Sequence, residues 1–96
     1  MPDPVDLLVL LWAVPGRLQE LKEYEDRVLK LIIEHGGKVV DRLRNLGTEG
    51  PSEIHVLHFS SQVDLDSYMN DSRRLDLATD RERCVARTDV IRVERV

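Results

Sequence analysis

Cysteine and aromatic residues are both scarce in this sequence, and each shortage narrows what the protein can be. Cys84 is the only cysteine, so the chain cannot form an intramolecular disulfide and nothing indicates an oxidising compartment. Aromatic residues make up 4% of the chain, and the second, third and fourth predicted strands lack the exposed aromatic trio on which an RNA-recognition sheet stacks bases. We therefore expect a cytoplasmic protein without an RNA-binding face.

The sequence also lacks a cluster of basic residues and a long apolar run. Its net charge is −4, whereas binding to nucleic acid or to anionic membranes depends on clustered Lys and Arg. The opening Met1-Pro2-Asp3-Pro4 has no basic region of the kind that begins a signal peptide, and Val5 to Val14 is too short to span a bilayer. We expect neither a membrane nor a nucleic-acid partner, and one soluble domain covering residues 1–96.

Hydrophobic periodicity predicts four strands and two helical regions in the order β-α-β-β-α-β. The strands are expected at Val5 to Val14, Lys38 to Leu46, Ser52 to Ser60 and Asp89 to Val96. The first helical region is expected at Arg17 to His35. The second starts near Gln62 after a capping-box sequence, is interrupted at Asn70-Asp71-Ser72, and continues from about Arg73 to Arg87. The pair Gly36-Gly37 supplies the positive φ that ends the first helical region.

This order is the split βαβ, or ferredoxin-like, arrangement of an α+β protein with a four-stranded antiparallel sheet. In that arrangement the first and third strands lie at the centre. The patterning agrees independently, because Val5 to Val14 and Ser52 to Ser60 are apolar on both faces, as central strands are. The other two strands have one polar face, which is typical of sheet edges.

The apolar character of both faces of the central strands indicates a partner chain. Two helical regions can cover only one face of a four-stranded sheet, so the second face must be covered by something else. Each large apolar side chain left in water would forfeit about 1.5 to 3 kcal/mol, and the resulting patch would exceed what monomers usually expose. We expect a homodimer that forms through this sheet face.

Four short motifs resemble a known superfamily and together span most of the chain. They are Glu23-Tyr24-Glu25, His35-Gly36-Gly37-Lys38-Val39, Ile54 to Phe59 and Ser67-Tyr68-Met69-Asn70-Asp71-Ser72. With these motifs the chain resembles the dimeric α+β barrel superfamily, and within it a small bacterial family of unassigned function. The resemblance implies a ligand cavity between the helices and the sheet.

The superfamily includes cofactor-independent monooxygenases, muconolactone-isomerase-like enzymes, polyketide cyclases and proteins with no known activity. This chain departs from the small family's pattern at three positions. His58 stands where a carboxylate is usual, and Arg73 and Leu75 stand where a proline and a tyrosine are usual.

Two histidines in the third strand are the sharpest candidates for chemistry. His55 and His58 have opposite parity, so they point to opposite faces and cannot form a metal site within one chain. We expect no metal and no cofactor. His58 is the candidate general base in an apolar pocket; the alternative is a core histidine with a satisfied hydrogen bond. The parity leaves open which histidine faces the helices and which faces the dimer partner.

The other candidates for the site have polar groups at positions that could face a ligand. Tyr68 and Tyr24 lie on the core-facing stripes of their helices, where a phenol could orient a substrate carbonyl or simply pack. The remaining ligand-binding candidates are Trp12 as a cavity floor or core residue, Arg42 as an anion contact or a solvated side chain, and Ser72 as a family serine or a helix cap.

Three functions fit these observations. The leading one is binding of a small apolar, aromatic or polyketide-like compound, with cofactor-independent oxygenation, isomerisation or cyclisation by His58 and a tyrosine. The turn Val14-Pro15-Gly16-Arg17-Leu18 is similar to the Pro-Gly-x-Leu turn of ACT domains and suggests a regulatory amino-acid-binding module instead. The third is a non-catalytic dimerisation protein, which a fully packed interior would favour.

Overall fold

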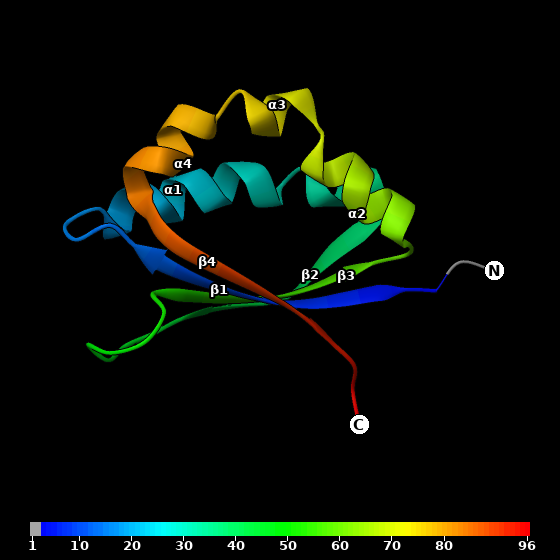
Figure 1. The fold of residues 1–96 in the computed structure, drawn as a ribbon, viewed down its shortest axis with the longest axis horizontal. Coiled ribbons are helices and arrows are strands. Elements are labelled where there is room, and N and C mark those ends of the chain that lie inside the picture. Colours follow the sequence, from blue (N-terminus) through cyan, green and yellow to red (C-terminus); the bar gives the residue numbers. More distant parts are fainter. Residues whose placement is uncertain (1–2) are drawn as a thin grey trace.

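A computed structural model describes residues 3–96, in which one antiparallel sheet carries all the helices on one face (Figure 1). The strands are β1 (Val5–Ala13), β2 (Gly37–Arg44), β3 (Glu53–Phe59) and β4 (Val85–Val93). The helices are α1 (Leu18–Leu29), the short 3-10 helix η1 (Ile32–His35), α2 (Gln62–Met69), α3 (Ser72–Leu75) and α4 (Ala78–Cys84). Met1 and Pro2, which belong to the opening segment interpreted above, lie outside the described residues.

The sheet has the predicted topology. Within residues 3–96 it contains four strands in the order β2-β3-β1-β4. Each neighbouring pair is antiparallel. The two strands with apolar residues at both parities, β1 and β3, therefore lie at the centre. The predicted ferredoxin-like α+β fold is confirmed.

Three predicted boundaries are wrong. The first helical region ends as an α-helix at Leu29 and continues as η1, and the segment predicted as one helix from Arg73 to Arg87 is divided into α3 and α4. The last strand begins at Val85 rather than Asp89, because β1 supplies pairing partners that local periodicity does not reveal: Val85 pairs with Ala13 and Arg87 with Trp12. No helix within residues 3–96 is long and apolar enough to cross a membrane.

The helices pack on one face of the sheet and form the core there. In the central strands, alternate residues such as Leu7, Val9, Leu57 and Phe59 are buried beneath them. Gly37 meets this core so closely that an added Cβ would lie 2.6 Å from Ile32 Cγ2 and 2.8 Å from Phe59 Cε1. The start of β2 consequently tolerates only glycine without a shift of the core.

The side chain of His35 connects the short helices of the helical layer through hydrogen bonds. The two ring nitrogens of His35 lie 2.8 Å from Ser67 Oγ and 2.8 Å from Asp71 Oδ2, so η1 is tied to α2 and to the residue that caps α3. Hydrogen bonds from Arg73 and from His35 hold the pKa of Asp71 well below its usual range. The contact between His35 and Asp71 therefore involves a charged carboxylate.

The opposite face of the sheet carries no helix. Apolar side chains on β1 and β3 lie there half-buried, and Ile91 and Val93 of β4 are exposed beside them. Figure 1 shows the labelled helices on one side of the sheet, whereas the C-terminal end leaves on the other side. The Cα atoms extend 44 × 34 × 16 Å, so the molecule is a thin two-layer slab with one apolar face bare. We call this face, made by the outward residues of β1, β3 and β4, the open face.

Candidate functional site

A cavity of about 370 Å³ lies between the helices and the sheet. This is where the resemblance places a ligand, and the volume is within the range of small-molecule sites. Its floor is apolar and is built mainly from β1 and β3, while its roof comes from α1, α2, α3 and α4. Seven of the lining residues carry polar groups: Tyr24, Glu25, His55, Tyr68, Arg74, Arg81 and Thr88.

The structure reverses the expected roles of the two strand-three histidines. His55 lines the cavity and is 1% exposed. His58 lies on the open face, where its Nδ1 is 2.9 Å from Asp6 Oδ1, so it does not line the cavity. The predicted separation of the two histidines is confirmed, but the placement of His58 in the pocket is wrong. Phe59 is the largest side chain on the same face of the strand as His55, and its size was the sequence signal that this face packs against the core.

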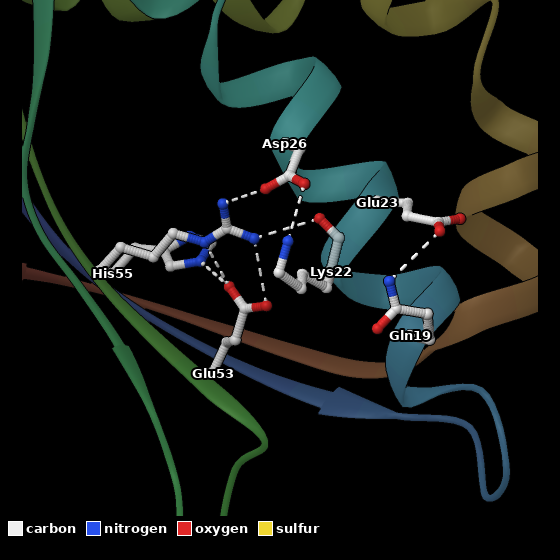
Figure 2. A network of polar contacts seen from close by, with 7 residues as sticks. Gln19, Lys22, Glu23, Asp26, Glu53 and His55 are labelled. Atoms are coloured by element: carbon white, nitrogen blue, oxygen red, sulfur yellow. Dashed lines mark hydrogen bonds and ion pairs between the residues drawn. The ribbon is translucent and has the colours of Figure 1, made fainter.

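His55 is the first member of a series of hydrogen-bonded and charged side chains (Figure 2). His55 Nε2 is 2.8 Å from Glu53 Oε1. The same carboxylate accepts hydrogen bonds from Arg42 Nε at 2.8 Å and from Arg42 Nη2 at 3.2 Å. Arg42 also pairs with Asp26 and donates to the backbone oxygen of Lys22 on α1. Arg42 thus links β2 and β3 to α1, and it does not contact the cavity as a ligand-binding residue would.

Glu53 is charged and fixes the tautomer of His55. Burial alone would raise the pKa of Glu53, but hydrogen bonds from His55 and Arg42 outweigh it and the pKa is lowered. A carboxylate can only accept a hydrogen bond, so we assign the ring proton of His55 to Nε2. In the neutral ring Nδ1 then carries the lone pair, and no described residue forms a hydrogen bond to it. His55 therefore has an available proton acceptor at the cavity wall.

Glu25 brings a second carboxyl group to the cavity. It is 5% exposed, on the buried stripe of α1 between Leu21 and Val28. Burial raises its pKa, and the nearby Glu53 charge raises it further, against the opposing effect of His55. The neutral acid is therefore favoured more strongly than in water. Its spacing of four residues after Leu21 was the sequence signal that could have identified it.

Replacing Glu25 by Gln is expected to raise the free energy of unfolding at pH 8 and to have little effect near pH 4. A carboxyl group whose pKa is raised by folding stabilises the fold below its unfolded pKa and loses that contribution as the pH rises through the folded pKa. Urea unfolding at the two pH values measures the difference. Glu23→Gln, on the exposed side of the same helix, should change the free energy by less than about 0.5 kcal/mol. An equal loss of stability for Glu25→Gln at both pH values would contradict this account.

The structure brings both predicted tyrosines to the cavity. The Tyr68 hydroxyl donates to the Val28 backbone oxygen at 3.1 Å, and burial raises the pKa of Tyr68 to about 12. Burial also raises the pKa of Tyr24. Both are neutral phenols at pH 7. No described residue accepts a hydrogen bond from Tyr24, which leaves its hydroxyl free to donate to a ligand.

The structure places Trp12 and Ser72 outside the cavity. Trp12 lies on the open face, where the Arg87 guanidinium stacks 4.4 Å from its ring centroid. Ser72 is exposed at the first position of α3, and the cap is the preceding Asp71, whose side chain accepts from Arg73 N. The interpretation of Ser72 as the cap is therefore one residue off. The residues of this site that sequence reasoning missed are Glu25, Glu53, Arg74 and Arg81.

Solved structures of several bacterial proteins share this fold. A candidate antibiotic biosynthesis monooxygenase from Caulobacter crescentus superposes with a TM-score of 0.82 at 12% identity, covering 99% of this chain and 92% of its own. A dabb family protein with a ferredoxin-like fold from Mesorhizobium loti gives 0.71 at 14%, covering 97% of each chain. A dimeric protein of unknown function with a ferredoxin-like fold from Bacteroides fragilis gives 0.75 at 11%, covering 96% of each.

These similarities are confined to the structure. No protein-family model matches the sequence, and no curated protein matches it either. The chain shares the ferredoxin-like fold of these proteins, so the predicted resemblance is confirmed at the level of the fold. Within residues 3–96 no group of three His, Cys, Asp or Glu side chains is placed to hold a metal ion.

Proposed function

We propose that the protein is a homodimer that binds a small aromatic or polyketide-like molecule in the cavity and transfers a proton to or from it without a cofactor. The observation that carries this proposal is the cavity itself, an apolar chamber of about 370 Å³ into which His55, Glu25 and Tyr24 project. Buried polar groups in folded proteins almost always have partners. Glu25, Tyr24 and Nδ1 of His55 form no side-chain hydrogen bond with a described residue, and the buried Nε of Arg74 has no partner, so a bound molecule would supply partners to polar groups of this cavity.

The proposed chemistry assigns one step to each polar group. His55 Nδ1 would take a proton from a ligand carbon next to a carbonyl group, and the electron pair of the broken C–H bond would remain on the ligand as an enolate. The Glu53 carboxylate would stabilise the resulting imidazolium, as a carboxylate does behind a catalytic histidine. Tyr24 would donate to the enolate oxygen, and Glu25 in its acid form could return a proton.

Removal of a proton in this way is a shared first step of isomerisation, cyclisation and cofactor-independent oxygenation. The likeness to the Caulobacter monooxygenase candidate is consistent with that range of reactions but rests on the fold alone. A non-catalytic dimerisation protein is less well supported, since its interior would be fully packed. The ACT-like turn at residues 14–18 lies apart from the residues that line the cavity.

Two observations support the homodimer. The chain exposes 6305 Å², whereas a folded monomer of 11.1 kDa exposes about 5,700 Å² by the usual scaling. The excess fits a protein with one uncovered apolar face. The Bacteroides fragilis protein of the same fold is described as dimeric.

Filling the cavity tests the binding site. N-phenyl-1-naphthylamine, a neutral fluorescent probe, should bind the wild-type protein with enhanced emission, because the cavity is apolar. Leu65→Trp places a larger side chain in the lining and should weaken probe binding at least tenfold. Leu75→Trp makes the same change on α3 at an exposed residue outside the lining and should leave binding unchanged.

The near-ultraviolet circular dichroism of both variants shows whether the fold is retained. If folded Leu65→Trp protein binds the probe as the wild type does, the molecule binds elsewhere and the proposed site is wrong. If the wild-type protein does not bind the probe at all, the proposed binding site is also wrong.

A further inference from the structure

Two arginines in the cavity wall have no acidic partner. Neither Arg74 nor Arg81 forms an ion pair with a described carboxylate, although Arg73, Arg83 and Arg87 beside them pair with Asp71, Asp80 and Asp89. The sequence has more acidic than basic residues, so partners are not scarce. An unpaired charge in a low-dielectric wall is costly, and it is normally retained where a ligand supplies the opposite charge.

The surroundings of Arg74 are those of a binding group. Its Nε is buried and has no hydrogen-bond partner among the described residues. The guanidinium carbon lies 5.3 Å from the ring centroid of Tyr68, so Arg74 packs over a residue that also lines the cavity. Arg74 Nη1 donates a long hydrogen bond of 3.4 Å to the Met69 backbone oxygen, and a hydrogen bond from Arg74 also lowers the pKa of Tyr68 against the larger effect of burial. A planar guanidinium held in this way presents several unused donors to one planar acid group.

Arg81 and Tyr24 extend the same donor surface. Arg81 Nη2 donates to Thr88 Oγ1 at 3.0 Å, which anchors the side chain to β4 and leaves its other donors available. Both arginines lie near enough to Tyr24 to favour a negative charge at its hydroxyl. The three groups line the cavity from its helical side, while His55 lines it from the sheet.

The geometry points to a ligand that is an aromatic monoanion, a carboxylate or phenolate held by Arg74 and Arg81 with its ring over the apolar floor. This inference rests on the proposed function, because it specifies the ligand class of the same cavity. The neutral acid form of Glu25 is compatible with it, since a carboxylic acid donates a hydrogen bond to an anion. The charged group at the roof would direct the opposite end of the ring toward His55.

A matched pair of probes tests the charge preference. 8-Anilinonaphthalene-1-sulfonate carries the skeleton of N-phenyl-1-naphthylamine with one added sulfonate, so their affinities differ only through the anion. We expect the wild-type protein to bind the anionic probe at least tenfold more tightly. Arg74→Gln and Arg81→Gln should each weaken the anionic probe roughly tenfold or more and leave the neutral probe within about twofold.

Two further variants control for charge and for folding. Arg74→Lys keeps the positive charge but not the planar fork of donors, so it should bind the anionic probe more tightly than Arg74→Gln and less tightly than the wild type. Arg83→Gln changes an exposed arginine of α4 outside the lining and should leave the binding of both probes unchanged. The Leu65→Trp variant identifies the portion of probe bound in the cavity rather than on the open face. Displacement of the anionic probe by benzoate, by 4-nitrophenolate and by neutral benzamide distinguishes a carboxylate site from a phenolate site.

The outcomes separate the two proposals. If neither probe responds to Leu65→Trp, the cavity is not the binding site and the proposed function fails with the inference. If both probes bind in the cavity but respond equally to Arg74→Gln and Arg81→Gln, or if benzamide displaces as well as the anions do, the cavity binds neutral molecules and the inference alone is overturned.

Discussion

Leu10→Arg is expected to convert the protein from a dimer into a folded monomer. Leu10 lies in the central strand β1 on the open face, between Ile54 and Asp89 on the neighbouring strands. In a symmetric dimer each substitution places two like charges within one interface. The neighbouring Asp89 already pairs with Arg87, so the introduced charge has no unpaired acid beside it. An uncompensated buried charge costs roughly 3 kcal/mol or more, and the dissociation constant should therefore rise more than a hundredfold. In the monomer the long arginine side chain can extend its charge into water.

Sedimentation equilibrium at micromolar concentration measures this effect. Val63→Arg on α2, at a residue 74% exposed on the helical side, should leave the mass of the wild-type assembly unchanged. Circular dichroism should show both variants folded. A monomeric wild-type protein at that concentration would refute the dimer, and an unchanged dimer in Leu10→Arg would place the interface on another surface.

Glu53→Ala should produce the largest loss of stability of any change to the polar groups behind the site. The substitution removes the acceptor for both Arg42 and His55, and leaves the almost fully buried imidazole without a partner. Breaking a buried pair costs about 3 to 5 kcal/mol. Because Arg42 retains Asp26 and is partly exposed, we expect about 3 kcal/mol of the free energy of unfolding to be lost, measured by urea denaturation at pH 7.

Glu53→Gln separates charge from packing and remains informative if the alanine variant does not fold. The pKa of Glu53 is lowered by folding, so its charge stabilises the fold above the unfolded pKa near 4.5 and stops doing so as the pH falls below that value. The wild-type advantage over Glu53→Gln should therefore shrink between pH 7 and pH 4. Glu82→Ala, at an exposed residue of α4, is the control and should cost less than about 0.5 kcal/mol. A Glu53→Ala protein as stable as this control would contradict the structural role of the carboxylate.

The fold could be predicted because its signals are local and repeated. Apolar residues at both parities identified the central strands, and one polar face identified the edges, so the strand order followed without knowledge of any contact. The end of the last helix could not be predicted in this way. Val85 to Thr88 form a strand because β1 lies beside them, and that pairing is between residues far apart in the sequence.

The site was harder to predict from the sequence, because the fold as a whole determines which of two possible faces each strand buries. Alternation separated His55 from His58, but only the packing of the helices determines which of them is buried. Arg42 has the pattern of a free charge on an edge strand, and its two carboxylate partners come from β3 and α1. Arg74 and Arg81 lie in a polar, helix-forming stretch where nothing in the spacing marks a cavity wall.

The two sides of the cavity differ in how easily they can open. The floor belongs to a continuous sheet, whereas much of the roof consists of α2, α3 and α4, which have 8, 4 and 7 residues. Helices this short are not stable by themselves and depend on packing and on side-chain hydrogen bonds such as those of His35 with Ser67 and Asp71. Local opening of this part of the roof therefore costs less free energy than any disturbance of the strands. The roof can therefore adjust to a bound molecule while the sheet floor, which includes His55, keeps its position.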